Sequence, residues 1–179
     1  MSVGVPGNNP YVVTVGAMTD NYTPDNFYDD ILASFSSAGP TVEGFVKPDM
    51  VAPGGHARGI MQPTAYLALN YPEFHDGDKY FVMSGTSQAT AVVSGMVALL
   101  LQDEPFLTPD EVKYRLMTTA RPAAYHDGAG DLFYSVWQQG AGRVDDYGAV
   151  FGNFECTLEE PCAANREMDI GADLGDRLA

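Results

Sequence analysis

Apolar and small side chains run almost without interruption from Ala89 to Leu101. Placed on a helix, they occupy nearly every side over about four turns, whereas a surface helix would carry a polar face. A turn of small residues, Met83 to Ser87, precedes this run. The pattern therefore predicts a buried central helix whose first turn carries hydroxyl groups, with Gly95 at a close contact to a neighbouring element.

Three stretches upstream predict strands or the end of a strand. Residues 10–17 are rich in β-branched side chains and are bounded by Pro and Gly, which is typical of a buried strand in a largely parallel sheet. Residues 50–52 predict a second short strand, and residues 31–36 alternate enough for the end of another. Residues 18–30 are rich in Asp and Asn and contain Pro24, and residues 53–79 carry several Gly and Pro residues with scattered polar ones, so we expect loops in both.

A second helix is predicted after the central one. Thr108 is a favourable cap, Pro109 suits the first helical position, and Glu111 stands three residues after the cap, as in a capping box. The helix should end before Arg121-Pro122. We expect this element to be structural.

Composition narrows the classes of protein. The chain has 179 residues, 45% of them hydrophobic, which is enough for one sizeable core. The formal net charge of -15 repels phosphate backbones and argues against nucleic acid as a partner. Ser94 and Gly95 interrupt the longest apolar run, so no membrane span is expected. No calcium-binding Asp-x-Asp-x-Asp-Gly loop is present, and no metal or cofactor is assigned.

The composition changes after residue 150. Residues 151–179 contain seven acidic residues against two arginines, and we expect a weakly packed acidic tail or linker. The two cysteines, Cys156 and Cys162, both lie there. They are close enough in sequence for a small disulfide loop, and two free thiols remain the alternative.

The hydroxyl groups at the start of the central helix allow two interpretations. The first amides of a helix lack acceptors within the helix and carry the positive end of its dipole, so they stabilise negative charge. Ser87 is therefore placed for nucleophilic chemistry with an oxyanion beside it. Alternatively, Ser84, Thr86 and Ser87 are only capping residues, because Ser and Thr are favoured at helix starts.

Four segments distinguish these interpretations because, in order, they resemble parts of subtilisin-like serine proteases. They are residues 34–41 (SFSSAGPT), 47–54 (KPDMVAPG), 84–89 (SGTSQA) and 139–145 (QGAGRVD). The resemblance extends over residues 3–147 and corresponds to the C-terminal half of the family's catalytic domain.

The resemblance implies a serine endopeptidase that acts on polypeptides outside the cell, although no signal peptide is visible. It implies that Ser87 is the nucleophile and that Thr86 supports the oxyanion hole. The implied fold is α/β, a partial three-layer subtilisin-like fold with a mainly parallel sheet and a central buried helix that starts at the nucleophile. Residues 1–150 would form this part of the peptidase domain.

The rest of the family's catalytic machinery has no counterpart in this sequence. Its Asp and His precede the serine, but His56 and His75 lack the family's His-Gly-Thr context and His126 follows Ser87; we expect all three in exposed loops. Asn8 stands in a Gly-Asn-Asn-Pro turn and not at the family's oxyanion position. We therefore expect a fragment that is inactive alone. A non-catalytic, protease-like binding module is the alternative.

Overall fold

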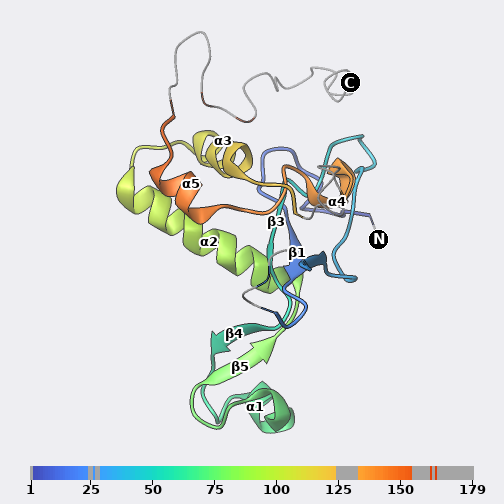
Figure 1. Ribbon diagram of the computed structural model, residues 1–179, viewed down its shortest axis with the longest axis vertical. Helices are drawn as coiled ribbons and strands as arrows, with labels where there is room; N and C mark the ends of the chain where they lie inside the picture. The colour runs from blue at the N-terminus through green and yellow to red at the C-terminus, as the bar shows by residue number, and fades with distance from the viewer. Residues whose placement is uncertain are drawn as a thin grey trace.

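The computed structural model describes residues 2–23, 26, 29–123, 133–154, 162 and 164, and its central element is a short sheet (Figure 1). The strand order is β2-β1-β3, with β1 at Val15–Thr19, β2 at Ile31–Leu32 and β3 at Met50–Pro53. β3 runs parallel to β1, with Val15 opposite Met50, whereas β2 runs antiparallel to it. The mainly parallel sheet expected from the sequence is thus one parallel pair among the described strands.

The first strand begins later than predicted. β1 starts at Val15 and not at Pro10, because the preceding backbone makes other hydrogen bonds. The amide of Tyr11 donates to the side chain of Asn9 at 2.8 Å, and the amide of Thr14 donates to the Asp49 carboxylate at 2.6 Å. These side-chain acceptors compete with a ladder for the backbone donors.

One long helix and several short ones surround this sheet. α2 (Thr86–Asp103) packs on β1 and β3, and α5 (Asp146–Phe151) lies between α2 and α3 (Pro109–Thr119). A short helix, α4 (Val136–Gln139), stands near the other side of the sheet (Figure 1). The chain is therefore an α/β protein, as the sequence predicts. None of the helices in the described residues has the length and hydrophobicity that a membrane span requires.

The core has two parts because strand side chains alternate between the faces of the sheet. One face contributes Ala17 and Met50 to a cluster with residues of α2, α3 and α5. The opposite face contributes Met18 and Val51, which are covered by Ala123 and partly buried neighbours. Among the described residues, no helix contributes a side chain to this second cluster.

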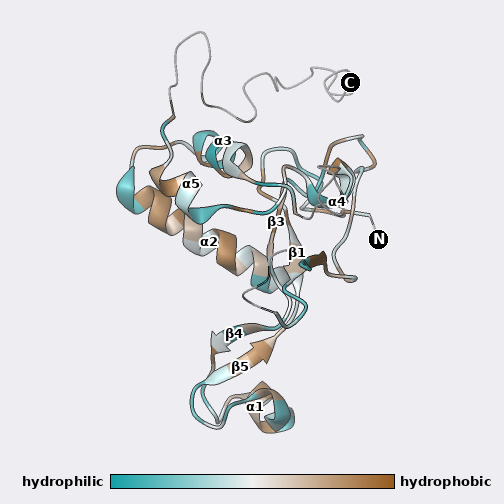
Figure 2. Ribbon diagram, viewed as in Figure 1, coloured by the Kyte–Doolittle hydropathy of each residue, from teal (hydrophilic) through white to brown (hydrophobic). Residues whose placement is uncertain are grey.

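The expectation that α2 is buried on every side is wrong. Its buried residues, Ala89, Val93, Met96 and Leu100, form a single stripe facing the sheet. Val92 and Leu99 on the remaining surface are 38% and 55% exposed, so an apolar face stays open (Figure 2). Gly95 lies on that face, and a Cβ atom there would meet nothing within 4 Å, which also overturns the predicted close contact.

Residues 53–79, predicted as loop, form a structured arm together with the next strand. β4 (Ala57–Ile60) pairs antiparallel with β5 (Tyr80–Met83), and the connection contains α1 (Tyr66–Asn70) and the short helix η1 (Pro72–Phe74). Figure 1 shows this arm extending from the body near the start of α2. The expectation that His75 is an exposed loop histidine is wrong, because its side chain is only 4% exposed inside the arm.

The capping box predicted for α3 is confirmed. The Thr108 hydroxyl accepts from the Glu111 amide at 3.3 Å, and the Glu111 carboxylate accepts from the Thr108 amide at 2.7 Å. The hydrogen bond from the Thr108 backbone, followed by that from its hydroxyl, lowers the pKa of Glu111. The helix ends at Thr119, before Arg121-Pro122, as expected.

Thr108→Ala is expected to reduce the free energy of unfolding by about 1 kcal/mol near neutral pH. Because the pKa of Glu111 is lower in the folded chain, its contribution is present above the usual value of 4.5 and is lost as the pH falls through the folded-state value. The difference between parent and variant in urea denaturation should therefore shrink in acid. Thr118→Ala, at the other end of α3, is the control, and an equal pH dependence there would contradict the assignment.

A buried ionic cluster ties the start of the chain to β3 and α3. The Asp49 carboxylate lies 2.7 Å from the Lys47 ammonium and 3.0 Å from that of Lys113, and all three side chains are at most 5% exposed. Lys47 also donates to the carbonyl of Val12 at 2.9 Å, and Lys113 to that of Pro10 at 2.5 Å. Burial lowers the pKa of Lys47, although Asp49 opposes the shift.

The segment after α4 closes the far edge of β3. The amide of Val51 donates to the Gly142 carbonyl at 2.9 Å, and the Val51 carbonyl accepts from Val144 at 3.0 Å. Gly142 has φ +117°, and a Cβ atom there would strike the backbone carbonyl of Arg121. Glycine is therefore required at this position by both conformation and space.

The described residues of the tail contact α3. The ring centroid of Phe154 lies 4.4 Å from the Arg115 guanidinium carbon. Cys162 is 5% exposed and disulfide-bonded. The predicted loop between Cys156 and Cys162 also involves Cys156, which lies outside the described residues. The division at residues 150 and 151, and the weak packing expected of the whole tail, stay predictions.

Candidate active site

The start of α2 is held against the ends of β1 and β3. The amide of Gly85 donates to the Gly54 carbonyl at 2.8 Å, and the amide of Gly54 donates to the Met18 carbonyl, also at 2.8 Å. A Cβ atom on Gly54 would lie 2.7 Å from the Gly85 carbonyl oxygen and 2.8 Å from Ala17 Cβ. Glycine at residue 54 thus allows the turn before α2 to sit directly on the sheet.

Ser87 is the second residue of α2 and is exposed. Among the described residues, none forms a hydrogen bond with its hydroxyl group. The first hydrogen bonds to this turn come from the amides of Gln88 and Ala89, which donate to the Gly85 carbonyl. The amide of Ser87 precedes them and is one of the donors that a helix start leaves without an intrahelical acceptor.

The capping interpretation of the hydroxyl groups has no support in the contacts. The cap position of α2 is Gly85, and no side chain caps the helix. Ser84 Oγ instead accepts from the amide of His56 at 2.9 Å. Thr86 is half-buried, and its side chain makes no hydrogen bond within the described part of the chain.

Neither histidine described by the structure contacts Ser87 through its ring. The ring of His56 stacks on Tyr22 with centroids 3.9 Å apart, and its Nδ1 lies 3.4 Å from the Thr19 hydroxyl. In the arm, His75 Nε2 lies 3.0 Å from the Met61 carbonyl oxygen, and Nδ1 accepts from an amide. His56 is half-buried, not exposed as expected, and His126 lies outside the described residues.

Asn8 is a turn residue, as the sequence predicts, and its side-chain amide donates to the Glu43 carboxylate at 3.2 Å. The Asn8 side chain therefore already has a hydrogen-bond partner, Glu43. The described residues also contain no group of three or more His, Cys, Asp or Glu side chains that could hold a metal ion.

Two cavities in the described residues do not include Ser87 in their lining. One of about 660 Å³ is bordered by Val92 and Met96 of α2 and by the ion pair of Asp30 and Arg143, whose atoms are 2.6 Å apart. Burial raises the pKa of Asp30 against the opposing effect of the Arg143 guanidinium.

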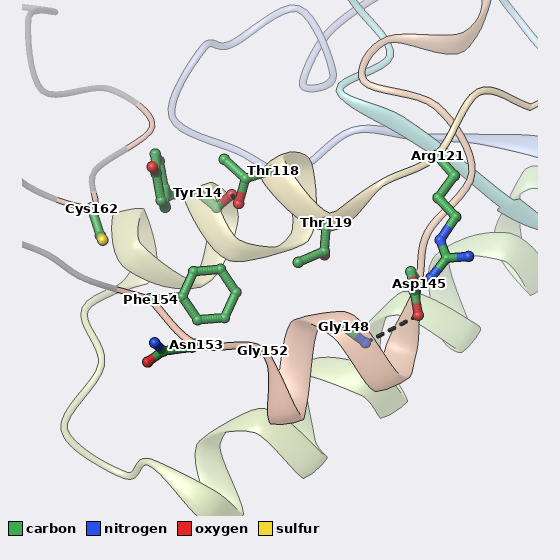
Figure 3. A pocket seen from close by; sticks show the side chains of 10 residues that line it. All are labelled: Tyr114, Thr118, Thr119, Arg121, Asp145, Gly148, Gly152, Asn153, Phe154 and Cys162. Carbon is green, nitrogen blue, oxygen red and sulfur yellow. Dashed lines mark hydrogen bonds and ion pairs between the residues drawn. The ribbon is translucent and has the colours of Figure 1, made fainter.

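The other cavity, of about 490 Å³, lies between α3, α5 and the start of the tail. Figure 3 shows Arg121 and Asp145 together at one end of it and Phe154 and Cys162 at the other. The hydrogen bond from Gly148, followed by that from Arg121, lowers the pKa of Asp145. These contacts hold α5 in place and give no reacting pair.

The family is established by comparison with known proteins. Residues 1–148 match the model of the subtilase family, a class of serine proteases, and the chain belongs to this family. The fold is thus that of a subtilase.

Individual relatives show the same relationship. The serine protease AprX of Bacillus subtilis is 47% identical over 112 residues, which are 63% of this chain and 25% of AprX. Fervidolysin of Fervidobacterium pennivorans, a keratinolytic enzyme, superposes with a TM-score of 0.58 at 26% identity and covers 83% of this chain and 20% of its own. The patellamide maturation protease PatA gives 0.53 at 31% identity, with 82% and 44% covered. The chain thus spans less than half the length of these relatives.

Proposed function

We propose that this chain carries the nucleophile, Ser87, of a serine endopeptidase that hydrolyses peptide bonds in polypeptide substrates. The observation that carries the proposal is the exposed Ser87 hydroxyl, without a hydrogen-bond partner among the described residues, at the start of α2 in a member of the subtilase family. Such a hydroxyl is accessible to a substrate carbonyl, because no group in the described residues forms a hydrogen bond with it.

The reaction is nucleophilic acyl transfer. Ser87 Oγ attacks the scissile carbonyl carbon while a histidine takes its proton and an aspartate orients that histidine. The tetrahedral oxyanion is stabilised by the amide of Ser87 and by an asparagine side chain, with Thr86 supporting the hole. The amine leaves with the proton from the histidine, and water then releases the acyl group by the same steps in reverse.

We infer that the Asp, the His and the oxyanion Asn come from polypeptide outside these residues. Two observations support this inference. The rings of His56 and His75 are engaged by other groups, and the chain covers only 25% of AprX and 44% of PatA. Alone, the chain would lack a general base, so the Ser87 hydroxyl would stay protonated and unreactive near neutral pH.

The remaining functional expectations are compatible with this role. A polypeptide is the partner, and the charge of -15 disfavours nucleic acid. No cofactor is required for the chemistry. We infer an extracellular location, which the disulfide at Cys162 supports, because disulfides persist in oxidising compartments.

The test compares the chain alone with a longer protein in which the upstream part of its gene is included. Casein hydrolysis and labelling by a fluorophosphonate are expected only for the longer protein. Robust hydrolysis by the short chain would mean that His56 or His75 reaches Ser87 and would contradict the proposal. A longer protein that neither cleaves nor becomes labelled would favour the binding module instead.

A further inference from the structure

The hairpin of the arm has one covered face and one open face. The register places Arg58 opposite Val82 and Ile60 opposite Tyr80, so these four side chains share a face. We call them the open hairpin face. On the other face, Phe81 is 5% exposed and lies against the rings of Phe74 and His75, at centroid distances of 6.2 and 6.3 Å.

Apart from Arg58, the open hairpin face is apolar, and of its four side chains only Val82 is half-buried. Ile60 is 79% exposed and Tyr80 is 37% exposed. The hydropathy colouring in Figure 2 shows β5 as a mainly apolar strand. Within the described part of the chain, β4 pairs only with β5, so its outer edge is free to accept another extended segment.

The charges at this face are unusual for the chain. Five of the seven described lysines and arginines form ion pairs with Asp or Glu, in spite of the large excess of acid. Among the described residues, only Arg58 and Lys79 form none. Arg58 belongs to the open hairpin face, and the Lys79 ammonium lies 5.3 Å from the centroid of the Tyr80 ring. Two unpaired cations thus lie at one apolar face of a chain with a net charge of -15.

We propose that the open hairpin face binds an extended segment of the polypeptide substrate that contains acidic and apolar side chains. Its carboxylates would pair with Arg58 and Lys79, its apolar side chains would cover Ile60 and Tyr80, and its backbone would add to the free edge of β4. The identification of the bound segment as a substrate rests on the proposed function. The expected preference for acidic and apolar side chains rests only on the residues of the site.

The position of the face fits a substrate. β5 ends at Met83, and the chain then passes directly through Ser84 and Gly85 to Ser87. Ser87 follows Tyr80 by seven positions, so at most about 25 Å of chain joins the face to the nucleophile. One extended polypeptide can therefore occupy both sites, which raises the local concentration of its scissile bond at Ser87.

Other occupants fit the charges less well. A symmetric pair of copies would bring Arg58 and Lys79 of both copies into one interface, and like charges across an interface are repulsive. An anionic lipid surface would attract two cations weakly and would repel the remaining acidic chain. An acidic peptide instead can form ion pairs with Arg58 and Lys79, the only lysine or arginine side chains in the described residues without such a pair.

Fluorescence anisotropy with a labelled peptide in which Glu alternates with Val and Tyr tests the site on this chain. The double variant Arg58→Glu, Lys79→Glu is expected to weaken binding roughly tenfold, and Ile60→Ser several-fold. Binding should fall as salt is added. Two controls should change binding less than about twofold: Tyr66→Ser, an exposed aromatic on α1, and Arg121→Gln, which removes an exposed cation of the body without placing a carboxylate beside Asp145.

Three outcomes would overturn the proposal. One is peptide binding that is unaffected by the double variant. The second is equal binding of a matched peptide with Lys in place of Glu. The third is that the parent chain does not bind the peptide but binds anionic vesicles or forms a dimer in sedimentation, and that the double variant loses this binding or dimer.

Kinetics on the longer protein separate this proposal from the proposed function. In the double variant, KM for an acidic, apolar protein substrate should rise, while kcat for a short ester should not change. If Ser87→Ala abolishes cleavage but the double variant changes neither binding nor KM, only the proposal of this site fails. If the double variant weakens peptide binding but Ser87→Ala leaves cleavage intact, the site stands and the proposed function fails.

Discussion

Ser87→Ala is expected to abolish peptide hydrolysis by the longer protein, with a fall in kcat of about six orders of magnitude. The variant removes the only atom that forms the covalent bond with the substrate carbonyl, so the remaining oxyanion donors give little assistance. The fold should be retained, because the Ser87 side chain is exposed and has no partner among the described residues. Steady-state kinetics, with circular dichroism of both proteins, measure the effect.

Ser94→Ala is the matched control for that experiment. Ser94 lies on the same helix and is exposed. Its hydroxyl donates to the Thr90 carbonyl at 2.8 Å, so it is engaged with its own helix two turns after Ser87. Its kcat should stay within about twofold of the parent, because such exposed substitutions are small in effect. A longer protein in which Ser87→Ala still cleaves at the parent rate would remove the nucleophile assignment.

Asp49→Ala is expected to reduce the free energy of unfolding by about 3 to 5 kcal/mol. The variant leaves the ammonium groups of Lys47 and Lys113 buried without their carboxylate, and it also removes the acceptor of the Thr14 amide. An uncompensated buried charge costs more than the lost attraction itself, because each ion has already left water. Urea denaturation monitored by circular dichroism gives the difference.

A triple variant provides the control for the charge argument. Replacing Lys47 and Lys113 by Met together with Asp49→Ala removes both uncompensated cations and keeps apolar volume, so most of the lost stability should return. If Asp49→Ala alone costs less than about 1 kcal/mol, the cluster does not carry the buried charges described. If the triple variant is no more stable than the single one, packing and not charge explains the loss.

Local signals predicted the helices better than the sheet. Thr108, Pro109 and Glu111 identify the start of α3 because a capping box depends on neighbouring residues alone. β4 was missed because Arg58 and Gly59 break any strand pattern, and its pairing with β5 depends on residues about twenty positions away. The arm therefore could be found only from long-range contacts.

The burial of α2 was predicted wrongly for a different reason. Its sequence is apolar on nearly every side, so the pattern cannot distinguish the stripe facing the sheet from the face that stays open. Which face of α2 is buried depends on which other segments of the chain pack against it. The expected exposure of His75 is wrong for a similar reason, because two hydrogen bonds within the arm allow its polar ring to be buried.

The candidate site could be predicted only in part. Ser87 follows from a short motif that places a hydroxyl at a helix start, and its position there is confirmed. The buried cluster at Asp49 was not expected, because lysine and aspartate are usually exposed and nothing local indicates that Lys113 returns to the same point. The open hairpin face was likewise hidden, since it exists only after β4 and β5 pair.

The open side of α2 has a consequence for how the chain behaves in solution. Val92 and Leu99 offer an apolar surface to other molecules, and the net charge of -15 keeps copies of the chain apart. At about 0.1 M salt this repulsion reaches only about 10 Å, and strongly hydrated salts such as sulfate also strengthen apolar contacts. Colloidal stability should therefore decline as salt rises, the reverse of ordinary salting-in, so dilute buffers favour monodisperse samples of this chain.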